Sequence, residues 1–275
     1  MSETLFAQEP WIRLIVFAGA FACLALLEGL HPRRVRRQTR LSRWPVNGAM
    51  VVLGSVAIRL MGPIVAVEMA LVADAAGWGL FNSLSWPVWL ELALAVILLD
   101  LVIYAQHVLF HHVPMLWRVH QMHHADLDLD VTSGIRFHPI EFALSMAIKA
   151  LAVLGLGASA AAVILFEIIL NAMAMFNHAN LAVPAWLDRT LRLILVTPDM
   201  HIVHHSVRRE ETDSNFGFNL SVWDRLFGTY RARPVLGPVN VLIGLPERQA
   251  PERLTLRAML WMPFENAPRG DRIRS

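Results

Sequence analysis

The feature that most constrains the fold of this chain is a series of apolar segments, each about as long as a membrane-crossing helix. A helix needs about 20 mostly apolar residues to cross a hydrocarbon core about 30 Å thick. The three segments that meet this requirement are residues 11–30, 46–76 and 88–110. The second contains Gly62-Pro63, where a kink is expected. A fourth region, residues 142–176, is too long for one helix; divided near Gly155, it predicts a membrane hairpin.

The composition agrees with a membrane protein. Apolar residues make up 56% of the chain, charged residues 17%, and the mean hydropathy is +0.47. A chain this apolar and weakly charged builds neither a disordered segment nor an ordinary solvated surface. Its single Cys excludes a disulfide framework and a cysteine-based zinc site. We therefore predict an all-α integral membrane bundle of about four transmembrane helices or helical hairpins, in a single domain over residues 1–275.

An arginine-rich segment sets the expected orientation. Six arginines lie within residues 31–43, between the first two apolar segments. Basic loops remain in the cytoplasm, so the N-terminus is expected outside, and in a bacterium the membrane would be the inner or cell membrane. Contact with anionic lipid headgroups is favoured over a nucleic-acid partner. On this topology residues 107–140 and 177–245 form a cytoplasmic helical cap, and residues 246–275 form a cytoplasmic C-terminal tail.

Histidines are concentrated where the apolar segments end on the cytoplasmic side. The chain has 12 His. Eight of them form three clusters: His107 with His111, and two H-x-x-H-H motifs, His120-His123-His124 and His201-His204-His205. Residues at these spacings project to one side of a helix. A ninth, His178, follows the predicted hairpin. Imidazoles this close repel one another when protonated and lose hydration when buried, unless a metal organises them.

This set of ligands indicates two metal ions, each held by four or five imidazoles, because eight or nine ligands exceed the capacity of one ion. Imidazole suits iron, zinc, copper and nickel. Iron is favoured because the site faces lipid and the sequence shows no Ser or Cys nucleophile motif, which fits oxidation of an unactivated C–H bond. The predicted ligands are His107, His111, His120, His123, His124, His178, His201, His204 and His205.

Metal-bound imidazoles donate their second N–H to carboxylates or carbonyls. Acidic residues near the clusters are candidates for this role, and each is equally a candidate helix cap or arginine partner: Asp100, Asp126, Asp130, Glu141, Asp199 and Asp224. His112 faces away from the ligands of its helix by spacing. His138, beside a proline, is a candidate to orient a ligand or to end a helix. Asn180, which closes an FNHAN motif, is a further candidate.

Five stretches of the chain carry a family resemblance. They are DLVIYAQHVLFHHVPMLWRVHQMHH (100–124), RFHPIE (136–141), FNHAN (176–180), HIVHHS (201–206) and NFGFNLSVWDRLFGTY (215–230). In this order, over most of residues 100–230, they resemble the fatty acid hydroxylase / sterol desaturase superfamily of histidine-box membrane oxygenases. The likeness is to a sterol-desaturase-like member of bacterial type. Catalytic residues beyond the metal ligands are not indicated.

The resemblance implies a di-iron centre that uses O2 to hydroxylate or desaturate a membrane lipid. The electrons would come from a separate ferredoxin, cytochrome or reductase. By position, His107 and His111 match the first histidine box, and the two H-x-x-H-H motifs match the second and the last. His178 matches a further histidine often counted with the ligands. His112 stands where many relatives have arginine, and His138 belongs to a motif of the sterol-desaturase-like branch.

Two other functions remain alternatives. A zinc-dependent membrane hydrolase needs fewer histidines, and its usual H-E-x-x-H motif is absent from the sequence. A metal transporter would place histidines and acidic residues along the membrane interior, whereas these lie at one side. The sequence leaves open the class of lipid, and it does not separate hydroxylation from desaturation.

Overall fold

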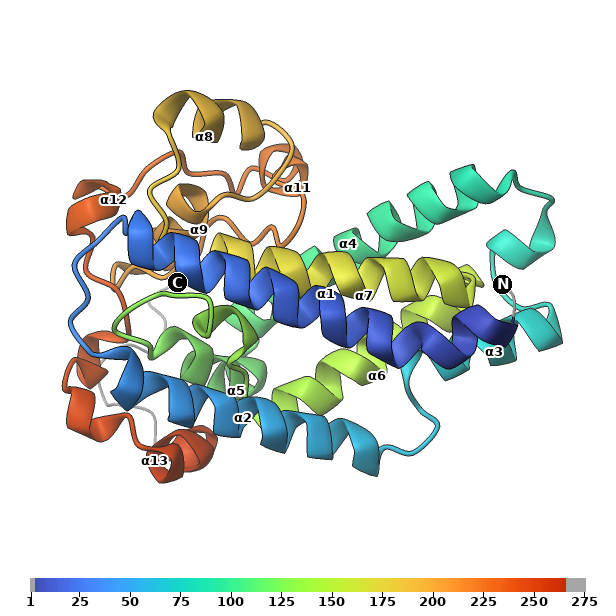
Figure 1. Ribbon diagram of the computed structural model, residues 1–275, viewed down its shortest axis with the longest axis horizontal. Helices are drawn as coiled ribbons and strands as arrows, with labels where there is room; N and C mark the ends of the chain where they lie inside the picture. Colours follow the sequence, from blue (N-terminus) through green and yellow to red (C-terminus); the bar gives the residue numbers. More distant parts are fainter. Residues whose placement is uncertain (1–2, 266–275) are drawn as a thin grey trace.

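The protein is built of helices. A computed structural model describes residues 3–265, and within that range helices are joined by loops and three isolated β-bridges, without a strand. In the described residues, four helices are long and apolar enough to cross a membrane. They are α1 (Glu3–Leu30), α4 (Val88–His112), α6 (Pro139–Leu156) and α7 (Ala160–Asn177), which extend along the long axis of the molecule (Figure 1). The predicted all-α fold with about four membrane-crossing helices is confirmed.

The apolar region 46–76 belongs to two helices. These are α2 (Arg40–Leu60) and α3 (Ala66–Ala76), and they are separated around Gly62 and Pro63. Gly62 takes a left-handed conformation with φ of 63°, and Pro63 has no N–H with which to extend the hydrogen bonding of α2. Both helices pack against α6.

Residues 142–176, for which the sequence predicts a hairpin, lie in α6 and α7. Gly157 ends α6 with φ of 66°, a conformation that glycine adopts without strain. Ser159 begins α7 by accepting a hydrogen bond from the backbone N–H of Ala162. Glu91 of α4 accepts bonds from both the backbone N–H and the hydroxyl of Ser159, at 3.0 Å each. This turn is therefore fixed to α4 at the end of the bundle away from the histidines.

A buried ion network joins three of the membrane-crossing helices. The carboxylate of Glu167 in α7 accepts hydrogen bonds from Lys149 in α6 and from Arg13 in α1. Arg13 also pairs with Glu9 one turn earlier. Charged groups inside a membrane are costly unless they are paired. The network thus fixes α1 against the α6–α7 hairpin. Without it, α1 has few buried residues to hold it there, because no residue in its most apolar stretch is buried.

The other helices form a cap around one end of the bundle (Figure 1). They are α5 (Pro114–His124), α8 (Ala185–Leu191), α9 (Pro198–His204), α10 (Arg209–Thr212), α11 (Val222–Leu226), α12 (Gly237–Asn240) and α13 (Leu256–Trp261). Short 3-10 helices occupy connections throughout the chain: η1 (Phe81–Ser83), η2 (Ser133–Ile135), η3 (Pro246–Arg248), η4 (Pro251–Arg253) and η5 (Met262–Phe264).

The first part of the predicted C-terminal tail packs onto the cap. Leu254 and Met259 lie in a buried apolar cluster with Met122 of α5. Residues 246–265 therefore belong to the folded body of the protein. Residues 266–275 of the predicted tail lie outside the described residues.

The arginine-rich segment is bound to the protein itself. Arg43, nearly fully buried, donates to the carboxylates of Asp126 and Asp130. Arg33 makes two hydrogen bonds to the carboxylate of Asp199, at 2.7 and 3.0 Å. The other arginines, which bond to backbone or side-chain oxygens elsewhere in the chain, are Arg34, Arg36, Arg37 and Arg40. The structure gives all six arginines protein partners, which tie α1 and α2 to the cap, and contact of this segment with lipid headgroups stays a prediction.

The ion network predicts the cost of removing its carboxylate. In Glu167→Ala, Lys149 remains buried without its partner, so the free energy of unfolding should fall by about 3–5 kcal/mol. Thermal unfolding in detergent, followed by tryptophan fluorescence, measures the change. Glu68→Ala, at an exposed position on α3, is the control. Equal melting temperatures for the two variants would contradict the structural role of the network.

Candidate metal centre

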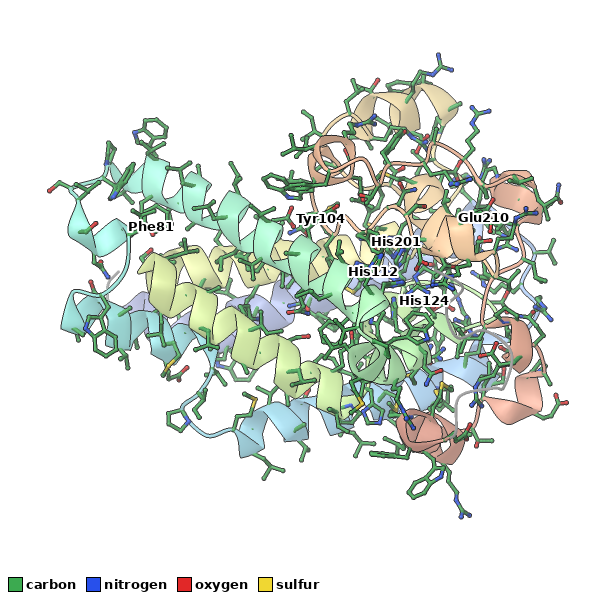
Figure 2. All side chains as sticks on the ribbon, turned by 180° about the vertical axis from the view of Figure 1, so that it is seen from behind. Phe81, Tyr104, His112, His124, His201 and Glu210 are labelled. Atoms are coloured by element: carbon green, nitrogen blue, oxygen red, sulfur yellow. The ribbon has the colours of Figure 1, made fainter. Side chains whose placement is uncertain are left out.

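All nine histidines predicted as ligands meet in one buried cluster, where the long helices join the cap. They form two groups, and within each group one nitrogen per ring lies within 4.8 Å of the others. Group A comprises His107, His111, His120, His124 and His204. Group B comprises His123, His178, His201 and His205. Figure 2 places His124 and His201 at this junction, with Phe81 at the opposite end of the bundle.

Four helices present these histidines at their C-terminal ends. α4 contributes two from its last turns, α5 and α9 end at histidines, and His178 directly follows α7. The C-terminal end of a helix carries a partial negative charge that favours cations. Because four such ends converge, the backbone adds a field suited to a positive ion.

Each H-x-x-H-H motif divides its histidines between the two groups. In α5, His120 and His124 join group A and His123 joins group B. In α9 the assignment is reversed, and only His204 joins group A. The first and last histidines of a motif are four residues apart and differ by about 40° around the helix axis. The middle histidine is adjacent to the last one and points about 100° away from it. Each motif therefore spans both groups and fixes their separation.

Neighbouring Nε2 atoms lie at distances expected for ligands of one ion. The Nε2 atoms of His123 and His178 are 3.0 Å apart in group B, and those of His120 and His124 are 3.2 Å apart in group A. Imidazole nitrogens bound at about 2.1 Å lie about 3.0 Å apart at right angles around an ion, and about 3.4 Å apart in a tetrahedron. The observed distances agree with imidazoles that share one ion.

Backbone carbonyls hold the opposite nitrogens of four rings. The acceptors of the Nδ1–H groups, at 2.8–3.1 Å, are the carbonyls of Phe216 for His107, Ser214 for His204, Ala174 for His178 and Arg136 for His123. A proton on Nδ1 leaves a bare lone pair on Nε2. The Nε2 atoms of His107 and His204 are buried and have no hydrogen-bond partner among the described residues. A metal ion would satisfy these two atoms, so the residues present fit one.

Burial keeps these rings neutral. Desolvation lowers the pKa of His178 to about 4 and that of His204 to about 3. Four other rings have pKa values well below the ordinary histidine range. Burial is the main cause and neighbouring imidazoles add to it, for His123, His124, His201 and His205. The neutral ring is the form that binds a metal.

Two of the acidic candidates act on histidines. Glu141, in the first turn of α6, accepts a hydrogen bond from Nδ1 of His120 at 2.7 Å. Asp224 accepts a bond from the backbone N–H of Phe216 at 2.7 Å. The carbonyl of Phe216 in turn holds His107, so Asp224 positions that ring through one residue of backbone.

The remaining carboxylate and amide candidates bond to groups other than histidine within residues 3–265. They are Asp100, Asp126, Asp130, Asn180 and Asp199. Three of them are the carboxylate partners of the arginine-rich segment. Asp100 accepts from the indole N–H of Trp223 at 2.9 Å, and Asn180 exchanges hydrogen bonds with the backbone of Arg34. These side chains fix the segments around the centre rather than the imidazoles.

His112 and His138 lie outside both groups. His112 is exposed, and its Nδ1 bonds to the carbonyl of Val108 in its own helix at 2.8 Å. His138 caps α6, accepting from the backbone N–H of Ile140, while its Nε2 donates to the carbonyl of Leu260. His138 therefore begins a helix and binds it to the C-terminal segment.

Asp213, which was not among the candidates from the sequence, contacts one of the predicted ligands, His111. Its carboxylate lies 3.4 Å from Nδ1 of His111, and it pairs with Arg209 at the surface. Its one sequence signal is an acidic side chain shortly after the last histidine motif. The carbonyl acceptors carry no signal at all, because every residue has a carbonyl.

The fold and the site together define the class of protein. It is a helical membrane protein in which nine buried imidazoles meet where helix ends converge. The Fatty acid hydroxylase family matches residues 92–229, which cover half of the chain and contain all nine histidines. The chain belongs to the fatty acid hydroxylase family.

Three relatives of known name share sequence similarity with the chain. An ornithine lipid hydroxylase of Rhizobium tropici is 28% identical over 266 residues, which are 94% of this chain and 77% of the relative. Human alkylglycerol monooxygenase is 31% identical over 157 residues, 56% of this chain and 33% of the relative. A fatty acid hydroxylase of a Lecanicillium species is 28% identical over 186 residues, 59% of this chain and 48% of the relative. The chain thus spans a third to a half of the last two. No solved structure matches the chain.

The bond between Glu141 and His120 predicts a loss of metal retention. Glu141→Ala removes the acceptor that orients the ring, and loss of such a partner weakens metal binding roughly 10- to 100-fold. Metal retained after dialysis against a graded series of chelator concentrations measures the effect. Glu247→Ala, at an exposed position of the cap, is the control. Equal retention in both variants would show that this carboxylate does not support the centre.

Proposed function

We propose that the chain is an O2-dependent di-iron hydroxylase of a membrane lipid. The observation that carries the proposal is the division of nine buried imidazoles into groups of five and four, in which the buried Nε2 atoms of His107 and His204 have no partner among the described residues. All nine histidines are the proposed ligands. Group A would hold one iron and group B the other.

The geometry of the two groups favours iron over the zinc of a hydrolase. Zinc sites take four ligands in a tetrahedron, and a catalytic zinc has three protein ligands and an open position. Group A has five imidazoles, one more than a tetrahedral zinc site takes. A metal transporter is disfavoured because the histidines gather at one end of the bundle instead of along it.

Two bound irons supply the reduction of O2, in which one oxygen atom enters a lipid C–H bond to give an alcohol and the other leaves as water, with two electrons and two protons consumed. The residues of the chain hold and orient the ions through neutral Nε2 atoms. Carbonyls and Glu141 keep the rings in place, and burial excludes bulk water from the centre. The two electrons come from a separate ferredoxin, cytochrome or reductase.

The relatives guide the choice of reaction and substrate. Those named above are hydroxylases or monooxygenases, which favours hydroxylation over desaturation. The Rhizobium relative matches along 94% of this chain, so ornithine lipid is the first substrate to test.

We further propose that the metal centre and the C-terminus lie in the cytoplasm and the N-terminus outside, because the arginine-rich segment lies at the metal-centre end.

Lipid extracts test the reaction. A host that makes ornithine lipid, expressing the chain under isotopically heavy O2, should gain a lipid heavier by one labelled oxygen. His123→Ala should abolish this product, because group B loses a ligand, whereas His31→Ala, at an exposed histidine, should retain it. Mass spectrometry reads both. A lipid lighter by two hydrogens would indicate desaturation, and a hydrolysed lipid formed without O2 would contradict the proposal.

Metal content tests the two groups separately. Purified protein should contain about two irons per chain by elemental analysis. His201→Ala should lower the content towards one iron, because group A keeps all five imidazoles while group B retains three. His31→Ala should keep both irons. A content of one metal in the unmodified protein, or zinc in place of iron after iron-supplemented growth, would overturn the assignment.

A further inference from the structure

Two segments of the cap form a surface that stands out sideways from the bundle. We call it the shelf, and it consists of residues 185–194, which contain α8, and residues 222–227, which contain α11. In Figure 1, α8 and α11 lie beside the long helices, within the length that α1 occupies, and not beyond its end. The shelf is therefore level with part of the membrane-crossing bundle.

Contacts with α4 fix the depth of the shelf. Asp100 of α4 accepts a hydrogen bond from the indole N–H of Trp223 at 2.9 Å and two more from neighbouring backbone N–H groups. The ring of Phe227 stacks on Tyr104 of α4 with centroids 5.4 Å apart. At 1.5 Å per residue, Asp100 lies about 10 Å and Tyr104 about 5 Å nearer the middle of α4 than His107. The shelf thus reaches below the level of the metal centre, towards the bilayer.

The end of α7 gives a second mark of depth. α7 ends at Asn177, whose side-chain amide donates to the carbonyl of Phe218 at 2.9 Å. The chain then runs from Phe218 to the groups held by Asp100. The segment that leads to α11 therefore passes from the end of one membrane-crossing helix towards the interior part of another.

The outer face of the shelf is apolar and carries only positive exposed charges. Its exposed apolar residues are Trp186 (69% exposed), Leu193 (60%), Ile194 (60%), Leu226 (69%) and Phe227 (55%). The exposed charged residues are Arg189 and Arg225, whereas Asp188 and Asp224 are buried. Apolar side chains with tryptophan and arginine are typical of a surface that lies in a membrane interface.

Hydrogen bonds join the two segments into one unit. The backbone carbonyl of Arg192 accepts from the hydroxyl of Ser221 at 2.7 Å and from the guanidinium of Arg225 at 2.8 Å. The backbone N–H of Ser221 donates to the carbonyl of Ile194 at 2.8 Å. The apolar face is therefore formed by the fold itself and needs no partner to assemble it.

We propose that the shelf is embedded in the headgroup and upper acyl region of the leaflet on the metal-centre side. Leu226, Phe227 and Ile194 contact acyl chains there. Arg189 and Arg225 meet anionic headgroups, which carry the complementary charge. Interfacial segments are buried about 5–10 Å deep in the headgroup and upper acyl region.

Site-specific quenching tests the proposal in vesicles of phosphatidylcholine and phosphatidylglycerol. In a Cys23→Ala background, which removes the single cysteine, a fluorescent maleimide is placed at Leu226→Cys or Ile194→Cys. Nitroxides on acyl carbons near the headgroup should quench both positions several-fold more strongly than aqueous iodide does. Elution as a single species and an unchanged melting temperature verify that each labelled variant is folded.

Two positions calibrate the measurement. Val35→Cys, in a loop at the far end of the cap where residue 35 is 95% exposed, should respond to iodide alone. Ile97→Cys, on the exposed side of α4, should respond to the lipid nitroxide alone. Shelf probes that behave like Val35→Cys would overturn the proposal, because the face would lie in water. Protection from both quenchers would also overturn it, because a second protein copy or a partner would cover the face.

Discussion

The structure depends on the burial of nine imidazoles where the C-terminal ends of four helices converge. Each inward lone pair has lost water, and for His107 and His204 no protein donor replaces it within the described residues. An unsatisfied buried polar atom costs about 1–3 kcal/mol, so an array of them is stable only with a ligand that satisfies them together. A pair of metal ions would do this, and the negative helix ends favour the same positive charge.

The rest of the fold holds these helix ends in place. The α6–α7 hairpin brings both Glu141 and His178 to the centre, and the ion network around Glu167 fixes α1 against that hairpin. The arginine-rich segment closes the arrangement from the other side, because Arg43 joins α2 to the loop that follows α5. These buried charged residues therefore join the protein's own helices. Removing one partner would leave the other charge buried without a partner.

Sequence analysis predicted the all-α membrane fold and selected all nine histidines that the structure gathers, because apolar runs and histidine spacing are local patterns. It could not assign the carboxylates in the same way. Asp126 and Asp199 stand next to histidine motifs, yet they pair with arginines remote in sequence. Asp213 lies further from the nearest motif than either of these, yet it contacts His111. Such pairings depend on how loops cross in three dimensions, which spacing along one chain does not encode.

X-ray absorption at the iron edge of the iron-loaded protein tests the central claim most directly, because it reads the atoms around the metal. The account predicts about two irons per chain, each surrounded by nitrogens at about 2.1–2.2 Å, with the outer-shell scattering of four or five imidazole rings. A first shell dominated by carboxylate oxygen, or one with only one or two imidazoles per iron, would contradict it.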